Sequence, residues 1–155
     1  MTIKLYRISL SKFINDMSGI GAKLYGGRWN QVGYPVVYAS GSRSLAALEF
    51  LVHVPMALAP KDLSIAEINI KKNIKPKAIK LGELPPNWRD YPAPQELVEL
   101  GTDWLRANSS LLLEVPSAVM EHEVNTLINP LHPDMQFVSI SLIEGFSFDS
   151  RLFKK

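Results

Sequence analysis

The sequence predicts an α+β fold in which a mixed β-sheet core carries flanking helices. Residues 3–10 (IKLYRISL) place apolar side chains among polar ones, as a half-buried strand does. Residues 95–108 (QELVELGTDWLRAN) repeat their apolar side chains at helical spacing, and residues 135–148 are again typical of a strand. Strands near both ends with helices between them do not make a regular βαβ array, which favours the α+β class.

The first half of the chain is predicted to hold a loop and a strand that leads directly into a helix. Residues 16–27 are rich in glycine, which indicates a loop. Residues 35–40 (PVVYAS) favour a strand, and Ser42 is suited to cap a helix through SLAALEFLVHV that Pro55 ends. The segment LSIAEINI then alternates like a second strand.

The second half adds an irregular connection and two further strands around the helix at 95–108. Residues 75–94 contain five prolines, so we expect no regular element there. Residues 110–116 (SLLLEVP) favour a strand, and residues 121–134 are expected to connect it to the last strand, at 135–148.

Length and composition are those of one globular domain over residues 1–155, with 46% hydrophobic and 21% charged residues. There is no cysteine, which excludes disulfides, thiolate zinc sites and cysteine nucleophiles. No stretch approaches the ~18 consecutive apolar residues of a membrane span. We therefore expect a soluble, cytoplasmic protein.

The charge pattern gives little support to nucleic-acid binding. The formal net charge is +2, and the lysines cluster only mildly between Lys71 and Lys80. Such a run is usually a solvated edge or loop. A nucleic-acid-binding protein that uses this run would show strongly salt-dependent affinity, and it stays an alternative.

Glu49 is unusual because it lies in an apolar helix of which nearly every face is predicted to be buried. A carboxylate removed from water without a partner would protonate, so we expect a cation or a substrate hydroxyl beside it. A structural salt bridge or a partly exposed edge explains it equally well. Glu49 and His53 also have the i,i+4 spacing of two metal ligands, although no third ligand is evident nearby. A metal-dependent hydrolase would lose its activity on chelation.

Residues 26–30 (GGRWN) combine two glycines, which allow unusual backbone conformations, with the permanent positive charge of an arginine. Beside two glycines, Arg28 can approach an anionic ligand closely, or it can stand on a surface turn. Trp29 is expected in the core. Tyr38, in the strand before the Glu49 helix, can pack its ring in the core or against an aromatic ligand.

The remaining polar candidates follow the strand at 110–116. Ser117 comes directly after that strand, where loops often present polar groups, and a turn or a helix cap is the alternative. His122 and His132 flank a stretch that contains Asn125 and Asn129. We expect surface or hydrogen-bonded structural roles for these histidines.

Taken in order, six short segments resemble the RES domain family, which is named for its arginine, glutamate and serine. The segments are GGRWN, VVYAS, SLAALEFLVH, LLLEVPSAV, NTLINPLHP and FSFDSRLF. The resemblance runs from LYRI near the start to FDSRL near the end. It implies an ADP-ribosyltransferase-like fold and a bacterial toxin that depletes NAD+ by cleaving it.

The same resemblance implies site residues, with NAD+ as a substrate rather than a cofactor. Arg28 and Glu49 would be catalytic, and Arg28, Tyr38 and Ser117 would bind NAD+, with Arg7 of LYRI a further candidate. Glu49 would contact the ribose hydroxyls as the ribose gains oxocarbenium character. Arg28 would hold the pyrophosphate or the ribose, Tyr38 would stack on nicotinamide, and Ser117 would bond the ribose or the carboxamide. No metal is implied.

The resemblance leaves the acceptor open. Water would make the protein an NAD glycohydrolase, phosphate as co-substrate would make it a phosphorylase, and a macromolecule would make it an ADP-ribosyltransferase. The expected partner is an Xre-type antitoxin that covers the cleft. The resulting toxin–antitoxin complex is expected to be larger than one pair, and it can contain a homo-oligomer of this chain. Neither a membrane nor direct nucleic-acid contact is expected. A nucleotide-binding module of the same shape without turnover is the alternative.

Overall fold

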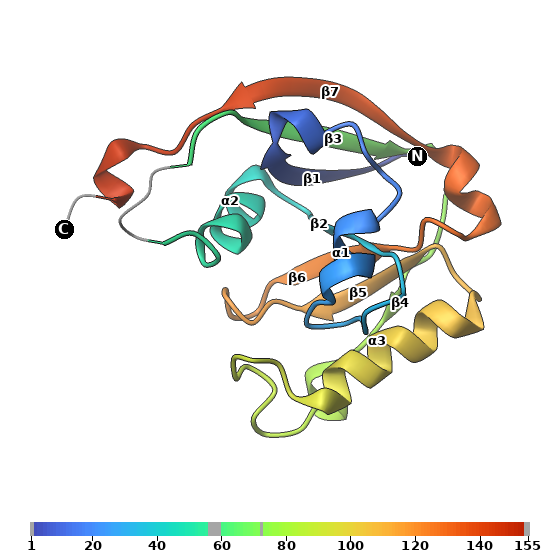
Figure 1. Ribbon diagram of the computed structural model, residues 1–155. Coiled ribbons are helices and arrows are strands. Elements are labelled where there is room, and N and C mark those ends of the chain that lie inside the picture. The colour runs from blue at the N-terminus through green and yellow to red at the C-terminus, as the bar shows by residue number, and fades with distance from the viewer. Residues whose placement is uncertain (1, 56–59, 72, 154–155) are drawn as a thin grey trace.

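The computed structural model describes residues 2–55, 60–71 and 73–153. These form an α+β structure around one mixed sheet with the strand order β4-β5-β6-β2-β1-β3-β7, which confirms the predicted fold class (Figure 1). Only β4 and β5 pair in parallel among these neighbours. The strands are β1 (Ile3–Leu10), β2 (Val37–Ser40), β3 (Leu63–Ile70), β4 (Lys77–Ala78), β5 (Leu112–Pro116), β6 (Val124–Ile128) and β7 (Val138–Phe146).

The helices of the described part are short, and none is long and apolar enough to cross a membrane. The α-helices are α1 (Ile20–Tyr25), α2 (Arg43–Leu51) and α3 (Gln95–Ala107). Four 3-10 turns accompany them: η1 (Ser11–Phe13), η2 (Leu81–Glu83), η3 (Pro133–Phe137) and η4 (Ser150–Leu152).

The helix α3 packs on the sheet through the apolar stripe that its periodicity predicts. Leu97, Trp104 and Leu105 are buried and join a cluster with strand residues of β5 and β6. Gly101 stands at the closest point of this packing, because a Cβ atom there would lie 1.8 Å from the carbonyl oxygen of Trp29. Trp29 itself is buried in the same cluster, which confirms its predicted place in the core.

The helix α2 begins as predicted, with the Ser42 side chain accepting a hydrogen bond from the backbone N–H of Leu45. Only Leu45 and Ala46 of α2 are buried, so the expectation that nearly every face is buried was wrong. The helix ends at Leu51 rather than continuing to Pro55. Because α2 covers the sheet with one face only, Glu49 is left half-buried at an edge instead of inside the core.

Two segments predicted as irregular contain regular elements. Residues 16–27 include α1, and the expected connection at 121–134 includes the strand β6. The strand predicted at 135–148 begins only after η3 and ends at Phe146. The sheet therefore has a central strand, β6, between β5 and β2 that the sequence analysis did not anticipate.

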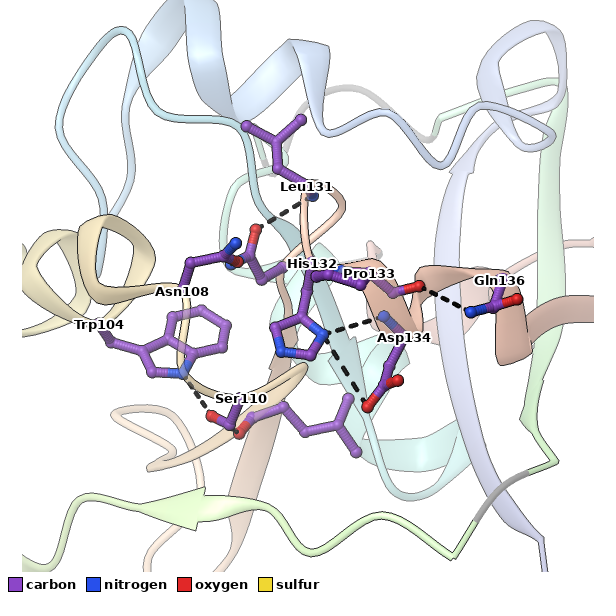
Figure 2. Close-up of polar contacts among 10 residues, drawn as sticks. Trp104, Asn108, Ser110, Leu131, His132, Pro133, Asp134 and Gln136 are labelled. Carbon is purple, nitrogen blue, oxygen red and sulfur yellow. Dashed lines mark hydrogen bonds and ion pairs between the residues drawn. The ribbon is translucent and has the colours of Figure 1, made fainter.

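His132 has the hydrogen-bonded structural role expected of it, and the neighbouring Asn129 has a similar one. The Nδ1 atom of His132 accepts a hydrogen bond from the backbone N–H of Asp134 at the start of η3, as Figure 2 shows. Asn129 is buried, donates to Oδ1 of Asn108 and accepts from the backbone N–H of Leu131. These contacts fix the chain where β6 turns toward η3.

Candidate active site

A cleft of about 1360 Å³ opens between α2, the GGRWN turn and the end of β5. Four of the predicted site residues line it: Arg7, Arg28, Tyr38 and Glu49. Ser117 lies behind the wall, between the lining residues Pro116 and Ala118. The volume exceeds the roughly 300–1,000 Å³ of pockets that take drug-sized ligands. A dinucleotide is among the ligands that a cleft of this size can hold.

Glu49 is held by two hydrogen bonds to one of its two oxygens. The Oγ atom of Ser117 and the Nδ2 atom of Asn125 each donate to Oε1 at 2.6 Å. The other oxygen, Oε2, accepts no hydrogen bond from any residue that the structure describes. The carboxylate is thus fixed in orientation and keeps one oxygen for a ligand.

Ser117 is almost completely buried, with 1% of its surface exposed. Its hydroxyl gives its only proton to Glu49 and accepts from the backbone N–H groups of Val119 and Met120, at 3.1 and 3.0 Å. Ser117 therefore both closes the turn after β5 and positions the carboxylate. A direct hydrogen bond from this hydroxyl to NAD+ stays a prediction, and it would compete with the bond to Glu49.

The GGRWN segment is a tight turn, held by hydrogen bonds between the Tyr38 hydroxyl and two residues of the turn, Trp29 and Asn30. The Tyr38 hydroxyl donates to Oδ1 of Asn30 at 2.6 Å and accepts from the backbone N–H of Trp29 at 3.1 Å. A Cβ atom on Gly27 would lie 2.7 Å from that hydroxyl, so only glycine fits there. Burial raises the pKa of Tyr38, which keeps the hydroxyl protonated as a donor.

Arg28 stands at the tip of this turn and shares the cleft with Glu49. Burial lowers the pKa of Arg28 from its usual value, and the nearby charge of Glu49 opposes this shift. One guanidinium nitrogen, Nη1, donates to the carbonyl oxygen of Trp88 at 2.8 Å. The remaining N–H groups of Arg28 have no protein acceptor in the described part of the chain, which leaves them for an anionic ligand.

The proline-rich segment at 84–94 forms a strap that joins the two sides of the cleft. Its Trp88 carbonyl holds Arg28 on one side. On the other side, Arg89 donates to the carbonyl oxygen of Ala118 at 3.1 Å and pairs with Glu121 at 2.9 Å. The irregular connection predicted at 75–94 is confirmed except for the two-residue strand β4 and the 3-10 turn η2 within it.

Arg7 lines the same cleft, but its guanidinium serves the loop after β1. It donates to the backbone carbonyl oxygens of Phe13, Ile14 and Asp16, the last at 2.8 Å. Since neighbouring residues of a strand point to opposite faces, Arg7 lies on the face opposite Tyr6, whose strand partner is Ser40. NAD+ binding by Arg7 stays a prediction, and it would require other donors than those that hold the loop.

No group of three histidine, cysteine, aspartate or glutamate side chains that could hold a metal ion occurs among the described residues. The His53 ring instead lies 6.4 Å from the ring of Tyr91. His122 is exposed, as expected. Within the lysine run, the side chains at 71, 75, 77 and 80 are exposed, whereas Lys72 lies outside the described residues.

Asn125 is the site residue that the sequence analysis missed. It lies on β6 directly opposite Ser40 of β2 and Val115 of β5. Residues 121–134 were expected to form a connection, so the Asn125 side chain was not expected to face Glu49. The available signal was composition: the run VNTLI contains the β-branched residues Val124, Thr126 and Ile128, which favour a strand.

Comparison with known proteins identifies the family. The family model described as "RES domain" matches residues 4–149. The chain belongs to the RES domain family. A protein of a Sphingobium species named "Prs ADP-ribosylating toxin" is 36% identical over 100% of this chain and 99% of its own length. A Yersinia enterocolitica protein named "Toxin Res" is 39% identical over 96% of this chain and 98% of its own length.

The fold is also found among solved structures. A chain from the crystal structure of the M. tuberculosis MbcT–MbcA toxin–antitoxin complex superposes with a TM-score of 0.73 and 14% sequence identity. The match covers 99% of this RES domain and 87% of the other chain. At this identity the likeness concerns the arrangement of strands and helices, and it agrees with the fold class that the sequence predicts.

Proposed function

We propose that this RES domain is the toxin of a bacterial toxin–antitoxin pair and that it cleaves the bond between nicotinamide and ribose in NAD+. The observation that carries the proposal is the Glu49 carboxylate, which has one oxygen fixed by Ser117 and Asn125 and the other free in a cleft shared with Arg28. The names of the relatives from Sphingobium and Yersinia support the toxin assignment.

The chemistry asks little of the protein beyond binding and charge. As the bond breaks, its electron pair leaves with nicotinamide, which becomes neutral, and the ribose takes on positive oxocarbenium character. A carboxylate that accepts hydrogen bonds from the ribose hydroxyls is favoured more in this transition state than in the ground state. Oε2 of Glu49 is the oxygen available for this, and the free N–H groups of Arg28 are available for phosphate or ribose oxygens.

The acceptor then bonds to the ribose carbon and loses a proton. Water gives ADP-ribose, and inorganic phosphate gives its phosphorylated form. A protein acceptor is a second candidate, because the Sphingobium relative is named "Prs ADP-ribosylating toxin" and is 36% identical to this chain. The three reactions share the bond that breaks, so Glu49 and Arg28 serve all of them.

The test is to incubate the purified protein with NAD+, with and without phosphate, and to measure nicotinamide by chromatography. We expect release by the wild type and a rate at least ~100-fold lower for Glu49→Gln, which keeps the size of the side chain but not its charge. Release that depends on phosphate identifies a phosphorylase. A labelled NAD+ analogue added to a cell lysate reveals a protein acceptor by transfer of the label.

No release and no transfer from a folded protein that binds NAD+ would contradict the proposal and favour a binding module. The antitoxin is proposed to be of the Xre type and to cover the cleft. Co-expression with the protein encoded beside the toxin gene should restore growth and stop nicotinamide release. An antitoxin that restores growth while leaving release unchanged would overturn the proposed mode of inhibition.

A further inference from the structure

Ser40 lies at the point where the sheet meets the helix that carries Glu49. It is the last residue of β2, is 3% exposed and stands directly opposite Asn125 in the β2–β6 ladder. Its hydroxyl donates to Oδ1 of Asn125 at 2.7 Å. Since the Nδ2 atom of Asn125 donates to Glu49, the three side chains form one chain of hydrogen bonds.

The Glu49 carboxylate sets the direction of the bonds in this chain, and Ser40 completes it. An asparagine amide has a donating end and an accepting end, and turning it over would place Oδ1 against the Glu49 carboxylate, where two acceptors repel. The carboxylate, which can only accept, therefore keeps Nδ2 on its side, and the Ser40 hydroxyl donates to Oδ1 and holds the amide in that place. Successive bonds with the same polarity strengthen one another at a buried position.

The backbone also connects Ser40 to the helix that carries Glu49. One glycine separates Ser40 from Ser42, the residue that caps α2. Glu49 follows Ser42 by seven residues, or about two helical turns, so it lies on the same side of the helix as the cap. Asn125 therefore links the end of β2 to the second turn of α2, across the base of the cleft.

We propose that Ser40 is a positioning residue for the reaction. By donating to Oδ1, it anchors the Asn125 amide with Nδ2 against Glu49, which holds Oε1 in place and keeps Oε2 directed into the cleft. The inference rests on the proposed function, in which that oxygen contacts the ribose. It assigns to Ser40 a role through Asn125, without contact with the substrate.

The test compares Ser40→Ala with Ser64→Ala. Ser64 is also a buried strand serine, and its hydroxyl bonds to Ser11 at 2.7 Å, outside the residues that line the cleft. We expect Ser40→Ala to lower kcat for nicotinamide release about tenfold with little change in KM, the size of one lost hydrogen bond to a charged network. Ser64→Ala should leave kcat unchanged, and Ser40→Thr, which keeps the hydroxyl, should restore it.

A double-mutant cycle separates positioning from a general loss of packing. In an Asn125→Ala background the Ser40→Ala change should lower kcat no further, because the amide that it orients is gone. Effects that multiply, or a Ser64→Ala variant that loses as much activity as Ser40→Ala, would overturn the proposal.

Side-chain amide resonances test the orientation without using activity. The pair of Asn125 signals, identified by its loss in Asn125→Ala, should shift in Ser40→Ala and return in Ser40→Thr. If the wild type releases no nicotinamide, the proposed function fails, but these signals still report on the hydrogen-bond chain. Asn125 signals that do not move in Ser40→Ala would show that Ser40 does not hold the amide in place.

Discussion

The hydroxyl of Ser117 donates a hydrogen bond of 2.6 Å to Oε1 of Glu49, so this serine and this glutamate act as one unit. The bond crosses from the turn after β5 to the second half of α2. It explains why a polar side chain with 1% exposure is needed at the end of an apolar strand. Ser117 therefore orients the Glu49 carboxylate whether or not a ligand is bound.

Ser117→Ala should lower kcat about tenfold while KM for NAD+ changes little, because the carboxylate loses one of the two donors that orient it. The turn should also become less stable by about 1 kcal/mol, since two backbone N–H groups lose their acceptor. Steady-state kinetics and thermal unfolding measure the two effects. A rise in KM at constant kcat would instead mean that the hydroxyl binds the substrate directly.

Arg28→Lys should raise KM for NAD+ about tenfold or more, even though the positive charge is kept. Lysine offers a point charge in place of the planar guanidinium, which can hold Trp88 and a phosphate or ribose oxygen at once. Arg43→Lys is the matched control, because Arg43 is exposed and pairs with Glu144. Equal KM values for the wild type and Arg28→Lys would remove Arg28 from substrate binding.

Tyr38→Phe should destabilise the protein by about 1–3 kcal/mol at neutral pH, since Asn30 and the Trp29 N–H lose their partner. The tyrosine also predicts a pH dependence. Burial raises the pKa of Tyr38 above the unfolded value of about 10, so its contribution to stability is complete below that pH. The contribution is lost as the pH rises toward the folded pKa, at up to ~1.4 kcal/mol per pH unit.

Urea unfolding between about pH 9 and pH 11 measures this dependence. The free energy of unfolding should fall less steeply with pH in Tyr38→Phe than in the wild type. Tyr25→Phe serves as the control, because Tyr25 is 85% exposed and its hydroxyl is in water in both states. The same slope in the wild type and in Tyr38→Phe would show that the Tyr38 hydroxyl ionises in the folded protein.

Much of the fold could be predicted because its longest elements carry clear sequence patterns. The strands β1 and β3 intersperse apolar and polar side chains over eight residues each, and α3 shows a clear apolar stripe. The helix α1 was missed because six residues containing a glycine give no such pattern. The strand β6 was missed because its five residues lie beside prolines and histidines that indicate a connection.

The site was predictable to the extent that its residues belong to recognisable motifs. Arg28, Glu49 and Ser117 each follow from a segment that resembles the family, and the structure brings them into one neighbourhood. Their supporting contacts were out of reach. The carbonyl that holds Arg28 lies 60 positions away at Trp88, and the amide that holds Glu49 lies 76 positions away at Asn125. Only the folded sheet determines which residues meet over such separations.

Among glycine-to-alanine substitutions in this chain, Gly101→Ala should be one of those that lower the free energy of unfolding most. Its Cβ atom would lie 1.8 Å from the Trp29 carbonyl oxygen, which belongs to the backbone, so either α3 or the GGRWN turn must move. We expect a loss of about 3 kcal/mol or more in unfolding free energy, at the upper end of overpacking effects. In molecules that remain folded, the displaced turn should weaken NAD+ cleavage through the neighbouring Arg28.

Gly82→Ala is the control for this prediction, because an added Cβ atom there meets nothing within 4 Å. Its unfolding free energy and its rate of nicotinamide release should both match the wild type. Thermal and urea unfolding of the two alanine variants, followed by kinetics below their transitions, measure the difference. A Gly101→Ala variant as stable and active as Gly82→Ala would mean that α3 stands farther from Trp29 in solution, and the contact between them would not be what holds the turn.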